Sequence, residues 1–409
     1  MTQDQQHDDA SNYNRASNIC LVMLCQSFQV LSFAGIALFL PTIRNDLNFS
    51  FTQGGTLSAT GILVYALMQI PAGYLADQYG LKRIFFIGAL GTTVLCFAFG
   101  LISEYWHASL NQAASGFFKA LLFASGLALL ASWFGPQRRA TAMGLSLIGI
   151  FSGQLLINAL GPSLAEHFTW RFPFIFFGSA GIMASFAYLW FGKESPRSES
   201  RQKPRLGDIF QLFRYRFMWV CGIIQYVRLG VVQGTSFWLP SLLIDEKGLS
   251  LQATGFIIAL RTLLIGPSNT IGGYISDRLK NPTLVIGFSL VILAMTTAAL
   301  VKVVRVDLLI ILTLINAIFI QFYFGPLFAV PVEKYGAHMT GTLSGFGNFF
   351  ANVGSLTFTY LLGLLKDQTG SFESGFYAIA TACLLGVVFT ILLGQMMRDA
   401  FGKSDREQT

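Results

Sequence analysis

Charged residues are scarce in this sequence. They make up 11% of its 409 residues, whereas hydrophobic residues make up 53%. A water-soluble core could not bury so much apolar surface, and a mean hydropathy of +0.58 is typical of proteins with many membrane spans. The sequence also lacks a G-x-x-x-x-G-K-S/T phosphate-binding loop, a Ser/His/Asp cluster and any cluster with metal-ligand spacing. We therefore expect neither an ATP-driven pump nor an enzyme, and no cofactor.

Paired cysteines and a leader segment are absent as well. The five cysteines all fall inside apolar segments, so we interpret them as small core residues with no disulfide and no zinc site. The first 17 residues are largely polar, without a basic region followed directly by a short apolar run and a cleavage site. We expect no cleaved signal peptide and a cytoplasmic N-terminus.

Long apolar segments dominate the rest of the chain. A spanning helix needs about 20 mostly apolar residues. Twelve segments qualify: 18–40, 54–76, 84–103, 108–133, 140–165, 172–192, 217–242, 251–276, 283–302, 308–331, 339–365 and 373–397. We predict an all-α polytopic membrane protein with a cytoplasmic tail (1–17), a six-helix bundle (18–192), a cytoplasmic linker (193–216), a second six-helix bundle (217–397) and a cytoplasmic tail (398–409).

Basic residues set the orientation of these spans. With both termini in the cytoplasm, the inner loops and tails hold eighteen of the 27 Lys and Arg residues, and the outer loops hold six. Cytoplasmic loops carry such an excess, so we predict this topology in a cell (inner or plasma) membrane. The net charge of +7 has the same origin and does not indicate nucleic acid. The expected partners are a small-molecule solute and the lipid bilayer, and we expect a monomer.

One polar turn occurs twice in the chain. The first copy contains Gly73, Asp77, Gly80, Lys82 and Arg83, and the second contains Gly273, Asp277, Arg278 and Lys280. A glycine and an aspartate four residues apart share one helix face, so the glycine would let a neighbouring helix approach while the carboxylate faces basic residues outside the bilayer. We expect these residues to form a gate that locks two bundles together and releases them.

The repeated turn resembles the signature loop between the second and third helices of the major facilitator superfamily, and its counterpart between the eighth and ninth. Helix number, chain length and the internal repeat agree with this resemblance over essentially the whole chain. Gln78 stands where a basic residue is common in the family, which removes one charge contact from the lock. The resemblance implies a secondary transporter built from two pseudo-symmetric six-helix bundles.

The two halves also match at their first helices, over residues 26–41 and 225–240. The match runs in parallel, as expected for halves related by an axis along the membrane normal, with the substrate site between them near the midplane. It pairs Gln29 with Arg228, so one half offers an amide where the other offers a permanent charge.

Three cations lie near the centres of predicted spans, namely Lys119, Arg228 and Arg261, whereas no Asp or Glu does. An ionisable group at this depth is costly and usually faces the bundle interior or a wet cavity. Cations without a protein counter-ion indicate an anionic substrate, with Arg228 as the two-pronged ligand of a carboxylate or phosphate. The alternative is that one or more of them snorkel, bond to backbone carbonyls or support the fold.

Residues 226–230 resemble the seventh-helix arginine stretch of the organophosphate:phosphate antiporters, whose arginine contacts the substrate phosphate. This resemblance adds Tyr226 to the predicted site. Those antiporters carry a second arginine on the first helix, which is missing here, so the resemblance favours an anion more than phosphate itself. A distant similarity to the anion:cation symporter branch points the same way.

Amides are frequent along the predicted spans. We select Gln29 and Gln225, which share helix faces with Gln26 and Arg228, as the best of them. The other predicted ligands are Asn316, Gln321, Asn348 and Asn352. For each of these amides, the alternative is a hydrogen bond between helices that contributes only to packing.

Glycines recur at near one-turn spacing in the fifth and eleventh spans. They are Gly144, Gly149 and Gly153 in the fifth span, and Gly341, Gly345 and Gly347 in the eleventh. We expect them to let neighbouring helices approach and rock during transport.

Together these features predict a secondary transporter that moves a small anionic solute, such as a carboxylate or phosphate ester, by alternating access. Because no carboxylate lies at mid-span, we expect coupling by exchange for a counter-anion, or by a proton held together with the substrate. A carrier of a neutral or zwitterionic metabolite, such as an amino acid or nucleoside, is the alternative. A transporter-like solute receptor is disfavoured because the tail after Arg398 is too short for an output domain.

Overall fold

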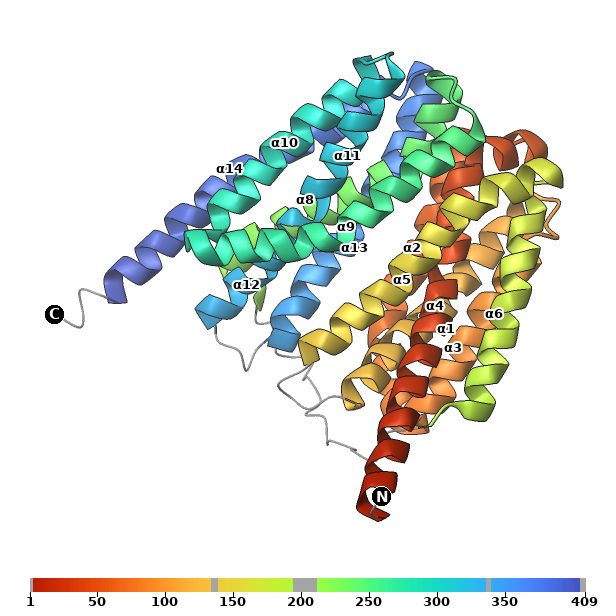
Figure 1. Ribbon diagram of the computed structural model, residues 1–409. Helices are drawn as coiled ribbons and strands as arrows, with labels where there is room; N and C mark the ends of the chain where they lie inside the picture. The colour runs from red at the N-terminus through yellow and green to blue at the C-terminus, as the bar shows by residue number, and fades with distance from the viewer. Residues whose placement is uncertain (1–2, 134–138, 194–211, 336–339, 405–409) are drawn as a thin grey trace. The chain divides into compact units, whose positions relative to one another are not determined.

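The computed structural model describes residues 3–133, 139–193, 212–335 and 340–404. These residues are almost entirely helical, and no strand forms among them (Figure 1). Helices are the expected spanning element, because a helix satisfies its own backbone hydrogen bonds inside the lipid.

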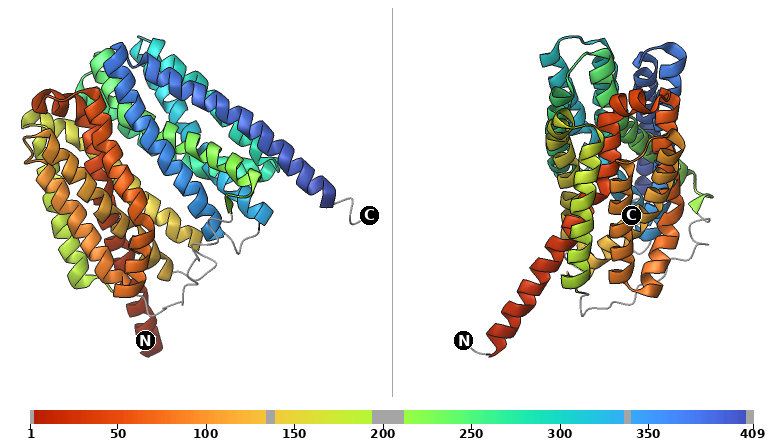
Figure 2. Two further views of the ribbon diagram at one scale, coloured as in Figure 1. Left: turned by 180° about the vertical axis from the view of Figure 1, so that it is seen from behind. Right: turned by 90° about the vertical axis from the view of Figure 1, so that its right-hand side faces the viewer.

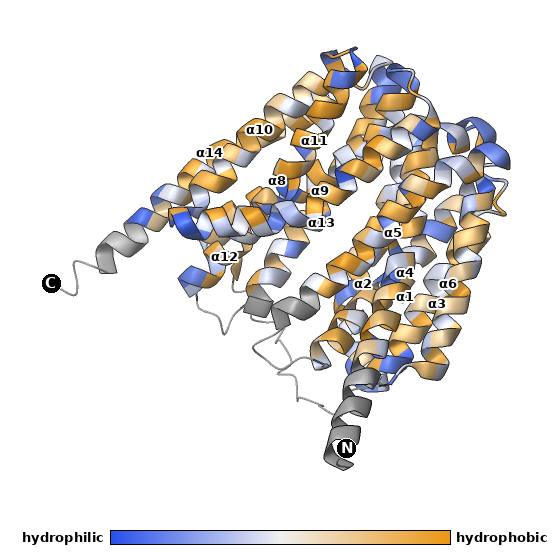
Figure 3. Ribbon diagram, viewed as in Figure 1, coloured by the Kyte–Doolittle hydropathy of each residue, from blue (hydrophilic) through white to orange (hydrophobic). Residues whose placement is uncertain are grey.

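The described part of the first half forms α1 (Gln3–Leu47), α2 (Phe51–Tyr79), α3 (Leu81–Phe99), α4 (Tyr105–Ser132), α5 (Arg139–His167) and α6 (Arg171–Phe191). The second half forms α8 (Arg216–Ser241), the π-helical turn η2 (Leu242–Glu246), α9 (Leu251–Leu279), α10 (Pro282–Lys302), α11 (Val306–Phe322), α12 (Phe324–Tyr335), α13 (Thr340–Thr369) and α14 (Glu373–Ser404). Twelve helical segments of the described ranges are long and apolar enough to cross a membrane. The twelve predicted spans are confirmed, and hydrophilic residues gather toward their ends (Figure 3).

The tenth span differs from its prediction. The continuous apolar run over 308–331 predicts one helix. The span itself is confirmed, but its helix is interrupted at Tyr323, which separates α11 from α12. Pro326 lacks a backbone N–H and cannot complete the helical bonding across this point. Gly272 of α9 also packs so closely on the Phe322 carbonyl that an added Cβ would lie 1.7 Å from its oxygen.

The chain forms two compact units. Unit 1 comprises Met1–Phe49, Thr56–Arg201 and Ser250–Ala259, and unit 2 comprises Ser50–Gly55, Gln202–Leu249 and Leu260–Thr409. In unit 1, α1 packs along α5, and α3 packs on α4 and α6 (Figure 2). In unit 2, α8 packs along α13, and α10 packs on α11 and α14. The same helix pairing occurs in both units, which confirms the internal repeat.

Glycines allow the tightest of these helix contacts. An added Cβ at Gly153 of α5 would lie 1.7 Å from the Ser27 carbonyl oxygen of α1. At the corresponding place in unit 2, a Cβ at Gly354 of α13 would lie 2.0 Å from the Tyr226 carbonyl oxygen of α8. Because any side chain there would collide with backbone, these positions require glycine.

The other predicted glycines differ in how closely they approach a neighbouring helix. Gly149 lies against the Met23 carbonyl of α1, where a Cβ would come to 2.9 Å, so the predicted close approach is confirmed there as at Gly153. A Cβ at Gly347 would make only ordinary contact with Gln225, at 3.5 Å. At Gly144 and Gly345 a Cβ would meet no described heavy atom within 4 Å, so for these two the close approach stays a prediction. The surroundings of Gly341 fall outside the described residues.

A carboxylate near the end of each unit's first helix is neutralised within that unit. In unit 1, Arg171 Nη2 lies 2.7 Å from Asp46 Oδ2. In unit 2, the largely buried Lys366 Nζ lies 2.6 Å from Glu246 Oε1, which also accepts a hydrogen bond from the Phe372 N–H. These pairs use the acidic side chains at the helix ends, so they supply no counter-ion to the cations at mid-span.

Candidate functional site

Arg228 lies in the middle of α8 and is 3% exposed. Its Nε donates to Gln225 Oε1 of the preceding turn, at 2.7 Å. The guanidinium carbon lies 4.8 Å from the ring centre of Phe324 and 5.8 Å from that of Phe328, both on α12. The amide and the aromatic faces together fix the guanidinium plane. Neither Nη nitrogen bonds to a described residue, so both remain for a planar, two-pronged acceptor such as a carboxylate.

The helix break places Tyr323 beside this guanidinium. The Tyr323 side chain is fully buried, and its hydroxyl has no hydrogen-bond partner among the described residues. It is close enough to Arg228 to interact with it electrostatically. A phenol can donate its proton to an acidic ligand while keeping its ring in an apolar wall. Arg228 and Tyr323 therefore each keep donors in unit 2 that an acid group could accept from.

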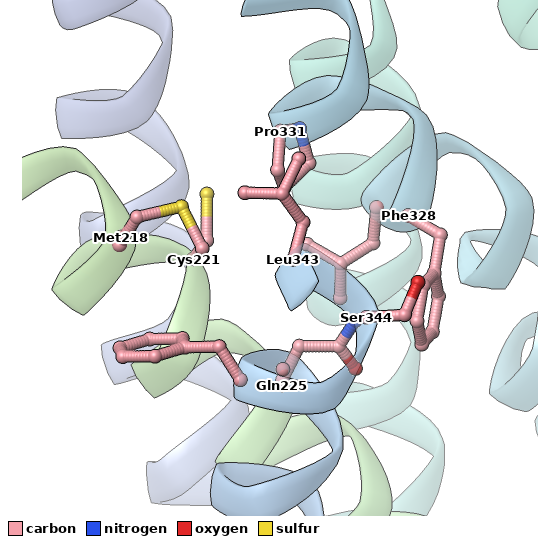
Figure 4. Close-up of a pocket in the computed structure, with 10 residues that line it drawn as sticks. Met218, Cys221, Gln225, Phe328, Pro331, Leu343 and Ser344 are labelled. Carbon is pink, nitrogen blue, oxygen red and sulfur yellow. The ribbon is translucent and has the colours of Figure 1, made fainter. Parts of the chain in front are cut away.

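Side chains of α8, α12 and α13 line a narrow crevice of unit 2 (Figure 4). Gln225 and Cys221 of α8 line it together with Phe328 of α12 and Ser344 of α13. Its volume is about 10 Å³, which is room for roughly one water molecule. Gln225 and Phe328 also contact Arg228, so the crevice adjoins the charged site. It is too small to hold an organic solute in this conformation.

Arg261 of α9 is the most deeply buried cation described, at 1% exposure. Its Nη1 donates to Ser236 Oγ of α8 at 3.1 Å, whereas Nε and Nη2 are buried without a partner among the described residues. No described carboxylate forms an ion pair with it. A buried, incompletely bonded guanidinium is costly, which favours a functional reason for its presence.

Lys119 and the first-helix glutamines belong to unit 1. Lys119 is partly buried on α4 and interacts electrostatically with Cys96 of α3. Gln26 is fully buried against Gly126 of α4, where a Cβ would lie 2.6 Å from its Nε2, yet neither of its amide atoms has a described partner. Gln29 is 8% exposed, and its Oε1 is also without a described partner. Unit 1 thus holds one cation and two under-bonded amides.

The remaining predicted ligands are bonded to different degrees. Asn316 Nδ2 donates to Thr296 and Thr297 on α10, at 3.1 and 3.2 Å, so it contributes to helix packing. Asn352 Nδ2 donates to the Asn348 carbonyl within α13. Gln321 Oε1 is buried without a described partner, and the ring of Tyr226 packs on Phe358 at 5.9 Å. Asn316 Oδ1 is likewise buried without a described partner, so both Asn316 and Gln321 keep an acceptor that a ligand could use.

At the repeated turns, Asp77 and Asp277 are both exposed. A Cβ added at Gly73 or Gly273 would meet no described heavy atom within 4 Å, so no described contact requires glycine at these positions, and their role in a gate stays a prediction. The glycine that the backbone requires is Gly80, whose φ of +91° turns the chain from α2 into α3. The predicted partners Lys82, Arg83 and Arg278 lie in the same two turns.

The sequence profile of the Major Facilitator Superfamily matches residues 22–359. The chain belongs to this superfamily. It is 24% identical to a hexuronate transporter of Bacillus subtilis, with 94% of the chain and 95% of that relative aligned. It is 23% identical to a Bacillus subtilis protein named probable galactarate/D-glucarate transporter, with 95% and 94% aligned.

A bacterial homologue of the human lysosomal transporter Spinster has the same fold. Its inward-facing, unoccupied crystal structure gives a TM-score of 0.77 at 17% identity, covering 93% of this chain and 96% of that chain. The superfamily member described here is therefore an integral membrane transporter with twelve spans in two six-helix bundles, and it is not an enzyme.

Sequence reasoning missed the two rings that hold Arg228. Phe324 and Phe328 stand in an apolar run where they look like lipid-facing residues. The Gly325-Pro326 pair beside them was the available signal, because glycine followed by proline marks a break in a helix. A break at mid-span is typical of transporter binding sites, where unwound backbone faces a cavity rather than lipid.

Proposed function

We propose that this transporter moves a small organic anion by alternating access, with Arg228 as its principal charge ligand. The observation that carries the proposal is the buried guanidinium of Arg228, which is oriented by Gln225 and two rings and leaves both Nη nitrogens for a ligand. Hexuronate, galactarate and D-glucarate, the compounds in the names of the two aligned relatives, are organic anions, which supports this substrate class.

Other predicted residues receive roles within this proposal. Arg261 and Lys119 add positive charge, and Tyr226, Gln321 and the glutamines of α1 and α8 bind polar groups of the solute. Asn316, Asn348 and Asn352 are assigned to the borders of the site. The gate consists of Gly73, Asp77, Gly80, Lys82 and Arg83 with Gly273, Asp277 and Arg278. The linker over 193–216 joins the bundles 18–192 and 217–397.

The distribution of basic residues supports a cell-membrane location with both termini in the cytoplasm. Coupling to a counter-anion or to a proton fits a chain whose predicted spans carry no acidic residue near their centres. A monomer as the active form is part of this proposal.

A neutral or zwitterionic metabolite is the second candidate, because one observation favours it. Gln26 presents a complete, fully buried amide without described partners, and Gln29 presents a free carbonyl oxygen. Amides of this kind bind hydroxyl and amino groups without selecting charge. This function would make Arg228 a ligand of one carboxylate or a purely structural residue.

Ligand binding by the purified full-length chain tests the proposal. Hexuronates, sugar acids, dicarboxylates, phosphate esters, amino acids and nucleosides are screened by thermal unfolding, because a ligand that binds the native state raises the melting temperature. We expect only anions to stabilise the protein. Arg228→Gln should weaken their binding by roughly 30-fold or more, as expected on removing one partner of a desolvated charge pair.

Arg305→Gln is the matched control, because Arg305 is exposed and pairs with Asp307 at the start of α11. It removes the same charge and should bind anions as the parent does. If neutral solutes stabilised the parent and the Arg228→Gln variant equally, this result would contradict the proposal and favour the amide-lined site.

A further inference from the structure

Arg261 has more hydrogen-bonding capacity than the protein uses. Its single described bond goes to the neutral hydroxyl of Ser236, and its Nε and Nη2 are buried without a described partner. A purely structural arginine usually donates its guanidinium hydrogen bonds to carbonyls or carboxylates. The under-bonded charge in unit 2 therefore calls for an acceptor from outside the chain.

Arg228 lies on α8, and Arg261 of α9 contacts α8 at a different level through Ser236. Ser236, which binds Arg261, follows Arg228 by eight residues on α8, so the two levels are about 12 Å apart along the helix axis. Leu229, Val232, Gln233 and Ser236 form a partly exposed stripe between them. Polar Gln233 and Ser236 would be costly against lipid, so this stripe suits a hydrated solute. The buried guanidinium groups of Arg228 and Arg261 thus lie at the two levels of α8 that this partly exposed stripe connects.

We infer that Arg261 binds a second acidic group of the substrate, so that the transported solute is a dianion with an acid group at each end of a short, polar carbon chain. This inference rests on the proposed function, since Arg228 must bind the first acid group. One dianion would neutralise both guanidinium groups, for which the described residues provide no carboxylate partner. Sugar diacids have this chemistry, and their hydroxyl groups match the polar stripe on α8.

Galactarate and galactonate make a matched pair of probes, because they share one carbon skeleton and carry two acid groups and one. Both are titrated by calorimetry into the purified full-length chain and into Arg261→Gln, Arg228→Gln and Arg305→Gln variants. The parent should bind galactarate about tenfold or more tightly than galactonate, since a second desolvated charge pair is formed. Arg261→Gln should weaken galactarate binding by roughly 30-fold and change galactonate binding by less than about threefold. Arg228→Gln should weaken both.

Equal affinity of the parent for the two acids would overturn the inference, as would a proportional loss of both in Arg261→Gln. If that variant does not fold, Arg261→Lys decides, because it keeps the charge and loses the fork. The Arg261→Lys variant should bind galactarate several-fold more weakly and galactonate as the parent does. If its affinity for both acids equalled that of the parent, the inference would be overturned.

The inference and the proposed function fail separately. Binding of galactonate that depends on Arg228, without any preference for galactarate, leaves the proposed function standing and removes the second subsite. If neither acid binds, the inference fails, and the wider anion screen decides the proposed function.

Discussion

Replacing Gln225 by glutamate should stabilise the protein and weaken its anion binding at the same time. Gln225 Oε1 lies 2.7 Å from Arg228 Nε, and a carboxylate of nearly the same shape would take the same position. The substitution therefore supplies Arg228 with an internal counter-ion where the native chain provides an amide. The substrate would then compete with a permanently tethered carboxylate.

The expected magnitudes follow from the geometry. Two unit charges about 4 Å apart interact by about 4 kcal/mol at an effective dielectric constant near 20. The desolvation of a new buried carboxylate cancels much of this gain, so we expect a net stabilisation of about 1–2 kcal/mol. Because the guanidinium is already neutralised, anion affinity should fall by roughly 30-fold or more, which corresponds to about 2 kcal/mol.

Thermal unfolding with and without a binding anion measures both effects. Gln225→Glu should melt a few degrees higher than the parent without ligand and gain little from added anion. Gln395→Glu, at an exposed position of α14, is the control, since it adds the same charge away from Arg228. A misfolded variant would lose stability and binding together, so opposite signs identify the charge effect. A Gln225→Glu protein that binds anions like the parent would refute the reasoning.

Two further substitutions test the packing and the turns. Gly153→Ala should destabilise the protein by about 1–3 kcal/mol or more in denaturant-induced unfolding, because its Cβ would collide with a backbone carbonyl of α1, whereas Gly144→Ala, in open space on the same helix, should change little. Equal effects would show that α5 does not pack on α1 in this way. Lys280→Gly should raise stability by about 0.5–1 kcal/mol, because Lys280 has a φ of +50° that glycine adopts more easily, and a loss of stability would contradict this backbone assignment.

Most of the fold could be predicted because hydropathy is a strong signal in a chain whose spanning helices must present apolar side chains to lipid. The predicted spans were shorter than the helices, since helices continue into polar ends that hydropathy does not detect, as α1 does past Arg44 to Leu47. The break at Tyr323 could not be placed from hydropathy. It depends on the packing of Gly272 against the Phe322 carbonyl, which is a contact between helices distant in sequence.

The site was only partly predictable, for a related reason. A cation within an apolar span is rare enough to be informative, so Arg228, Arg261 and Lys119 could be identified from the sequence alone. The rings that hold Arg228 could not, because phenylalanine occurs 39 times in this chain and most copies serve packing or lipid contact. Phe324 and Phe328 contact Arg228 because of where they lie, and the interruption of the helix at Tyr323 puts them there.

The repeat has preserved its backbone turns more closely than its side chains. Asn48 and Gly248 stand 200 residues apart and have positive φ values of 53° and 67°. Gly80 and Lys280 are also 200 residues apart, with φ values of 91° and 50°. A lysine held in a conformation that favours glycine indicates that the turn geometry was kept while the residue changed. Helix entry and exit are therefore the conserved framework of both halves.

The two halves differ most where charge selection is needed. Gln26 and Gln225 correspond between the first helices, but the residue three positions later is Gln29 in one half and Arg228 in the other. In unit 2 the glutamine therefore accepts a bond from the guanidinium, whereas Gln26 of unit 1 has no described partner. If both halves carried an arginine at this position, both arginines could bind the same small anion. Under the proposed function, the guanidinium of unit 2 binds an acid group and the amides of unit 1 suit hydroxyl groups, which is the chemistry expected of a sugar acid.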